Sequence, residues 1–179
     1  QFFYVGVQIM CWTFIIQYGT RVFMAEGMDE QAAEVLSQKY NIAAMILFVT
    51  CRFLCTWLMK YLKPSKLLTI FAIGGMIATA GVIFLQNRLG LYCLVAVSGF
   101  MSLMFPTIYG IALGGLGDDA KFGAAGLIMA ILGGSVLPPL QAWIIDKGTI
   151  GFLPAVNASF ILPFICFIVV CFYGIRTTK

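Results

Sequence analysis

An apolar stretch near the middle of the chain, MFPTIYGIALGG at residues 104–115, carries the groups best suited to recognise a polar solute. Phe105 and Tyr109 supply two aromatic rings and a phenolic hydroxyl, and Pro106 removes a backbone N–H from the local helix. In hydrocarbon, backbone groups freed in this way are tolerated only where they face protein or line a cavity. The stretch therefore indicates the wall of a cavity.

A second set of polar and aromatic side chains lies in the first apolar stretch, where Gln8 and Trp12 are one helical turn apart. Aromatic rings stack on the apolar face of a neutral polyol, while amide and hydroxyl groups bind its hydroxyls. We therefore predict a substrate site formed by Gln8, Trp12, Phe105 and Tyr109. For Gln8, an interhelical hydrogen bond is an equally weighted alternative.

A charged group inside the second apolar stretch is the next candidate. Arg52 lies about two turns from the end of that stretch, where a charge is costly unless it pairs or reaches the interface. Asp118 and Asp119 follow the fourth stretch on the same side of the membrane. We predict that Arg52 pairs with one of them as a cytoplasmic gate, with simple snorkelling of the arginine as the alternative.

Catalytic and metal chemistry find little support in the sequence. Ser98 precedes a glycine, which leaves a six-span membrane enzyme such as a serine intramembrane protease as a distant alternative, but the chain has no histidine to act as general base. The six cysteines include no Cys-x-x-Cys pair, and Cys51 and Cys55, one turn apart, are expected to pack as small apolar groups. We expect no catalytic residue, no metal site and no cofactor.

The composition identifies the elements that must position these groups. With 61% hydrophobic and 10% charged residues, the chain is typical of a membrane protein. A span needs roughly 20 mainly apolar residues. Six stretches qualify, at about 2–19, 40–60, 67–86, 89–113, 122–145 and 151–175. They are continuously apolar, so we predict an all-α bundle of six transmembrane helices. The basic residues behind the net charge of +4 lie mainly in the loops between the spans. They form no basic soluble face that could bind nucleic acid.

Charge also predicts the orientation. Six spans place both ends on the side that carries the KYLKPSK cluster, and the excess of lysine and arginine there favours the cytoplasm. The opposite side carries an acidic stretch between residues 26 and 34, which we expect to be a solvated linker. Tyr18 is expected to be an interfacial anchor. Pro138 and Pro139 are expected to interrupt the fifth span, since glycine and proline breaks mark the binding region of transporters.

Three segments together resemble a known family. The C-terminal half of the fucose and glucose/galactose permeases of the major facilitator superfamily is resembled by MFPTIYGIALGGLGDDAKFGAAG, RFLCTWLMKYLKPSK and FFYVGVQIMCWTFIIQY, of which the first is the most specific. The resemblance implies that residues 1–179 form one domain equivalent to spans seven to twelve. It also implies that Phe105 lines the sugar cavity and that Arg52 is the basic member of a cytoplasmic loop motif.

The resemblance further implies the activity and the partners. We expect a proton-coupled symporter that imports a monosaccharide, L-fucose first and glucose, galactose or another sugar as the alternative. Its partners would be the sugar, protons, membrane lipid and a missing N-terminal half, in the bacterial inner membrane with both ends cytoplasmic. Because all seven carboxylates fall in loops or at membrane ends, the proton carrier is expected in that other half.

Overall fold

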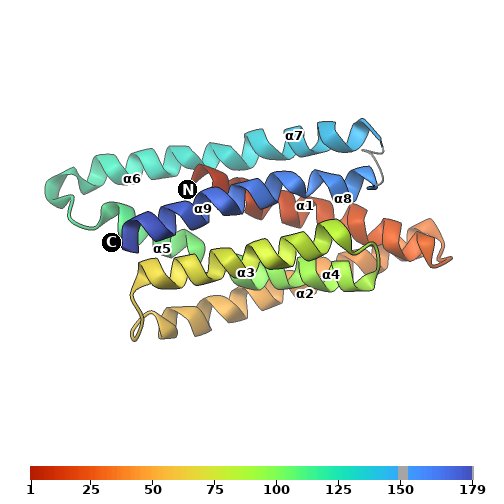
Figure 1. The fold of residues 1–179 in the computed structure, drawn as a ribbon, viewed down its shortest axis with the longest axis horizontal. Coiled ribbons are helices and arrows are strands. Elements are labelled where there is room, and N and C mark those ends of the chain that lie inside the picture. Colours follow the sequence, from red (N-terminus) through yellow and green to blue (C-terminus); the bar gives the residue numbers. More distant parts are fainter. Residues whose placement is uncertain (149–152, 179) are drawn as a thin grey trace.

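The computed structural model describes residues 1–148 and 153–178. Within these ranges, six helical segments are long and apolar enough to cross a membrane. They lie side by side, approximately along the long axis of the molecule (Figure 1). The predicted all-α class with six spans is therefore confirmed, and the chain is a multi-pass membrane protein.

Three of the six segments are interrupted. The elements are α1 (Phe2–Ala25), α2 (Glu30–Leu58), α3 (Pro64–Phe84), α4 (Arg88–Met101), α5 (Met104–Leu113), the 3-10 turn η1 (Gly117–Asp119), α6 (Ala120–Met129), the 3-10 turn η2 (Ala130–Leu132), α7 (Gly133–Asp146), α8 (Ala155–Ser159) and α9 (Ile161–Thr178). Figure 1 places the α2–α3 and α5–α6 connections at one end of the bundle and the α1–α2 and α3–α4 connections at the other. We call the first of these the basic end, because Lys60, Lys63, Lys66 and Lys121 lie there.

The acidic stretch is shorter as a loop than the sequence suggested. Helix α2 begins at Glu30, so Glu30 and Glu34 lie on a helix and the predicted linker through residue 34 was wrong. Asp29 precedes the helix with an extended backbone, and Glu30 occupies its first turn. Carboxylates at this position are stabilised by the helix dipole, which extends the helix beyond the apolar span.

The fourth span is interrupted just before its proline. Helix α4 ends at Met101, and α5 begins at Met104. In a continuous helix, residue 106 would donate its N–H to the carbonyl of Ser102, but Pro106 has no N–H and its ring crowds that carbonyl. Pro106 therefore causes the break at residues 102–103.

The fifth span is interrupted at a different place from the one predicted. Pro138 and Pro139 lie inside α7, which remains helical, so the expectation that they break the span was wrong. The irregular turn is η2, immediately before Gly133. An added Cβ on Gly134 would lie 3.0 Å from the Ile9 side chain. The helix therefore narrows to a 3-10 turn next to the two glycines that bring α7 against α1. The steric crowding caused by the prolines is relieved at this turn, on their N-terminal side.

Helix α1 lies at the centre of the bundle and packs against α2, α4, α7 and α9. The outer elements are far less covered. Among the described residues, 61% of the apolar window of α4–α5 is buried, compared with 17% for α2 and 11% for the segment from η1 to α7. These two segments present most of their surface to lipid or to another protein surface.

Candidate functional site

The candidate site lies where α1 passes the break between α4 and α5. The hydroxyl of Tyr4 donates a hydrogen bond of 3.0 Å to the carbonyl oxygen of Met101, the last residue of α4. The final carbonyls of a helix lack partners within that helix. Tyr4 therefore satisfies one backbone group that the break exposes, and it fixes α1 beside the start of α5.

Three aromatic rings follow one another from this point. The ring centroid of Phe105 is 6.2 Å from that of Tyr4 and 6.4 Å from that of Tyr109, and the Phe105 and Tyr109 rings are nearly parallel at 10°. Phe105 and Tyr109 are one turn apart on α5, and both are half-buried. The two rings on α5 thus keep an accessible part that a flat apolar surface can cover.

Trp12 connects three helices further along α1. Its indole Nε1 donates to the hydroxyl oxygen of Ser98 on α4 at 3.3 Å, and its ring packs edge-on against Phe48 of α2 at 5.0 Å. The guanidinium carbon of Arg52 lies 5.9 Å from the centroid of the same Phe48 ring. Trp12 is half-buried, so its orientation is fixed while part of the indole stays accessible.

Gln8 lies between Tyr4 and Trp12 on α1 and is half-buried. Its amide makes no hydrogen bond with any other group in the described part of the chain. The interhelical hydrogen bond considered above is therefore absent from this structure. An amide in this position has both its donors and its acceptor available to a solute.

Arg52 is exposed on α2, and Asp118 and Asp119 are exposed in η1. Arg52 forms no ion pair with either aspartate in this structure. The only ion pair found within residues 1–148 and 153–178 joins Arg88 to Glu26. The cytoplasmic gate therefore stays a prediction. The contact that Arg52 does make is with Phe48, which packs on Trp12.

A buried polar cluster lies at the end of the bundle opposite the basic end. Asn157 of α8 donates from Nδ2 to the carbonyl oxygen of Val82 at 2.9 Å, and Tyr18 of α1 contacts the same carbonyl and that of Leu85. Tyr18 is 1% exposed and packs edge-on against Phe160. The prediction of an interfacial anchor at Tyr18 was therefore wrong, because its hydroxyl satisfies carbonyls at the end of α3.

The chain is similar to known proteins in both sequence and fold. No family model matches the chain. The L-fucose-proton symporter of Haemophilus influenzae is 57% identical over all of this chain and 40% of its own length. The L-fucose-proton symporter of Escherichia coli is 31% identical over 97% of this chain, and a glucose/galactose transporter of Brucella abortus is 28% identical over 99%.

The crystal structure of the Major Facilitator Superfamily transporter FucP in the outward conformation superposes with a TM-score of 0.86 at 28% identity, covering 100% of this chain and 41% of that one. This chain has the fold of one half of a major facilitator superfamily transporter. The resemblance to the fucose and glucose/galactose permeases is confirmed. The chain spans about two fifths of the length of these relatives.

The transporter fold also bears on the alternative of a membrane enzyme. The relatives are transporters. Ser98, the candidate nucleophile, is buried and accepts its hydrogen bond from Trp12, which cannot act as a base. In the described residues, no group of three or more potential metal ligands occurs, and the six cysteines are free thiols.

The structure brings the predicted site residues into two pairs. Phe105 and Tyr109 lie together on α5, Gln8 and Trp12 lie together on α1, and Tyr4 joins the two pairs. Sequence reasoning missed Tyr4, Phe48 and Ser98 as supports of these side chains. The position of Tyr4 one turn before Gln8 was the available signal for the first, whereas nothing in the sequence pairs Trp12 with Phe48 or Ser98.

Proposed function

We propose that this chain is the C-terminal half of a secondary transporter that imports L-fucose together with protons. The observation that carries the proposal is the 57% identity over the whole chain to a protein named as an L-fucose-proton symporter. The relatives named as glucose/galactose transporters are 28–29% identical, so glucose or galactose is the second candidate substrate.

The half-buried side chains on α1 and α5 suit a monosaccharide. The rings of Phe105 and Tyr109 offer apolar faces to the C–H surface of the sugar, and the hydroxyl of Tyr109 and the amide of Gln8 offer hydrogen bonds to its hydroxyls. Trp12, oriented by Ser98, adds a third aromatic surface. In this proposal the sugar binds against this wall near mid-depth, where α4 and α5 separate.

The rest of the site would come from a second bundle in an N-terminal half. Helix α2 and the segment from η1 to α7 are the least covered elements, and none of the residues of α6 is buried. A Cβ added to Gly126 or Gly110 would meet no atom within 4 Å. Exposed small residues let another helix approach closely. Alternating access also requires two bundles that move about a shared site.

The proton carrier is assigned to the same missing half. In the described structure the seven carboxylates of the chain lie at helix ends or in connections. A coupling group needs to be reached from the cavity at membrane depth. The basic end would face the cytoplasm of a bacterium, because Lys60, Lys63, Lys66 and Lys121 gather there.

Transport in liposomes tests this proposal. The full-length protein, reconstituted with a pH-sensitive dye inside, should take up protons when L-fucose is added outside, and less or not at all with D-glucose or D-galactose. This chain alone should give no sugar-driven pH change. A response to glucose and galactose without one to fucose would replace the substrate, and sugar-driven proton uptake by the isolated chain would contradict the half-transporter.

A further inference from the structure

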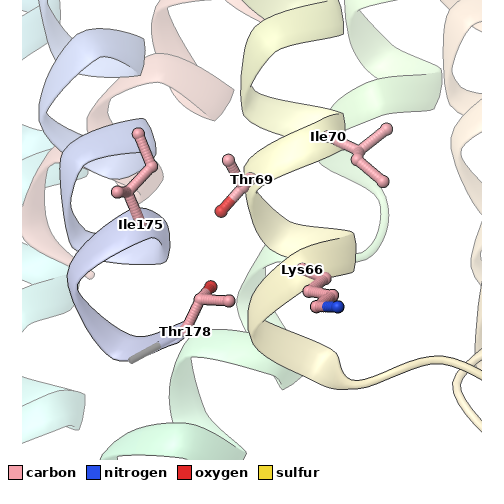
Figure 2. A pocket seen from close by; sticks show the side chains of 5 residues that line it. All are labelled: Lys66, Thr69, Ile70, Ile175 and Thr178. Atoms are coloured by element: carbon pink, nitrogen blue, oxygen red, sulfur yellow. The ribbon is translucent and has the colours of Figure 1, made fainter.

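A groove lies between α3 and α9 near the basic end. Its volume is about 430 Å³, within the range of ligand sites. The lining residues are Lys66, Thr69 and Ile70 from α3 and Ile175 and Thr178 from α9 (Figure 2). None of these residues takes part in the candidate sugar site.

The floor of the groove is a close contact between the two helices. A Cβ added to Gly174 of α9 would lie 2.6 Å from Oγ1 of Thr69, so the helices touch where α9 has no side chain. Ser65 fastens the same contact, because its hydroxyl donates to the carbonyl oxygen of Thr177 at 3.2 Å. The groove is therefore part of a fixed helix pair.

The walls of the groove are apolar although two of its residues are threonines. Thr69 donates its hydroxyl to the carbonyl of Ser65 at 3.0 Å, and Thr178 donates to the carbonyl of Gly174 at 2.7 Å. Each hydroxyl proton is thus used within its own helix. Ile70 and Ile175 are 59% and 51% exposed and complete a surface suited to a hydrocarbon chain.

Among the described residues, the charged side chains beside the groove are all cationic. Lys66 is exposed in the first turn of α3 and forms no ion pair with any carboxylate of the described residues. Neither α3 nor α9 contains an aspartate or glutamate, while Lys63 precedes α3 and Arg176 lies in the last turn of α9. A cation above an apolar groove at a membrane boundary complements a phosphate attached to an acyl chain.

We propose that this groove binds one anionic phospholipid, with the phosphate at Lys66 and an acyl chain along Ile70 and Ile175. A soluble anion would leave the apolar walls uncovered, and in a zwitterionic lipid the cationic group of the headgroup would offset the attraction of its phosphate to Lys66. The inference rests on the geometry of α3 and α9 and does not depend on which solute the protein carries.

Native mass spectrometry of the purified full-length protein tests the site, with phosphatidylglycerol as the probe and phosphatidylcholine as the comparison lipid. Lys66→Gln should weaken phosphatidylglycerol binding about five-fold, the effect of one basic side chain near the surface. Lys121→Gln, at the same end but on α6, is the matched control and should leave binding unchanged. Ile70→Trp keeps the charge but fills the groove, and it should also weaken binding.

Several results would overturn the proposal. Equal losses for Lys66→Gln and Lys121→Gln would mean diffuse attraction to a basic surface. Unchanged binding in Ile70→Trp would place the lipid elsewhere, and equal affinity for phosphatidylcholine would remove the role of the charge. If millimolar inorganic phosphate displaced bound phosphatidylglycerol, the site would be assigned to a soluble anion instead of a lipid.

Discussion

Phe105 provides the sharpest test of the aromatic wall formed by Tyr4, Phe105 and Tyr109, because its ring lies between the other two beside the break in the fourth span. Replacing it with alanine removes the middle ring and leaves the other two without a common neighbour. If the wall binds the sugar, Phe105→Ala should weaken binding while the transporter stays folded.

The magnitude follows from what the ring contacts. Phe105 makes two aromatic contacts, each worth about 0.5–1.5 kcal/mol beyond its buried area, and these affect stability of the unbound protein. The half-buried ring leaves one part for the sugar, and truncation of an aromatic anchor in a desolvated site costs about 1–3 kcal/mol of binding. This corresponds to an affinity roughly 5- to 150-fold weaker.

Calorimetric titration of the purified full-length protein with L-fucose measures this change directly. Phe105→Leu separates ring stacking from volume, since it retains an apolar side chain without a flat face. Phe122→Ala is the control, because Phe122 on α6 is 81% exposed and takes no part in the ring contacts of Phe105 with Tyr4 and Tyr109. If Phe105→Ala elutes as a folded protein and binds L-fucose as tightly as the parent, then Phe105 does not contact the sugar.

Three further predictions concern other parts of the chain. Arg52→Glu should increase labelling of a cysteine placed in the cytoplasmic vestibule, and Asp118→Arg or Asp119→Arg added to it should partly restore the parent pattern; unchanged labelling would leave Arg52 without a gating role. Arg88 donates three hydrogen bonds to Glu26 and holds the pKa of that carboxyl below its ordinary value of 4.5, so the pair stabilises the fold above that pH and the contribution is lost as the pH falls through the lowered pKa. Arg88→Gln should therefore lower the thermal midpoint slightly at pH 7 and by progressively less as the pH is lowered below 4.5, and a loss that is the same at every pH would exclude the ion pair as the cause. Asn157→Leu should destabilise the protein by about 1–3 kcal/mol, because it leaves a carbonyl at the end of α3 short of a donor, whereas Gln86→Leu on the exposed neighbouring loop should have little effect in the same unfolding measurement.

The number and class of helices could be predicted because the hydrocarbon sets the length of each apolar stretch. Their ends could not, since α2 extends to Glu30 through polar residues that no longer lie in hydrocarbon. Proline was an incomplete guide as well. Pro106 causes a break four residues upstream, whereas Pro138 and Pro139 remain inside α7. In the fifth span the irregular turn lies next to Gly133 and Gly134, the α7 residues that pack closely against α1.

The candidate site was predictable in its chemistry and incomplete in its supports. Gln8, Trp12, Phe105 and Tyr109 stand out because polar and aromatic groups are conspicuous in apolar helices. The contacts that orient Trp12 come from helices 36 or more residues away in sequence, and no local pattern encodes them. Asn157 was missed for the same reason, since its hydrogen bonds reach the end of α3 across 75 residues.

The interruptions at residues 102–103 and at η2 bound the hairpin formed by α5, η1 and α6. At each boundary the regular α-helical hydrogen-bond ladder is interrupted, so the resistance to bending is lowest there. The opposite ends of α1 and α3 are tied together by Tyr18 and Asn157. A displacement of the hairpin tip should therefore bend the chain at these two interruptions and leave the end held by Tyr18 and Asn157 in place.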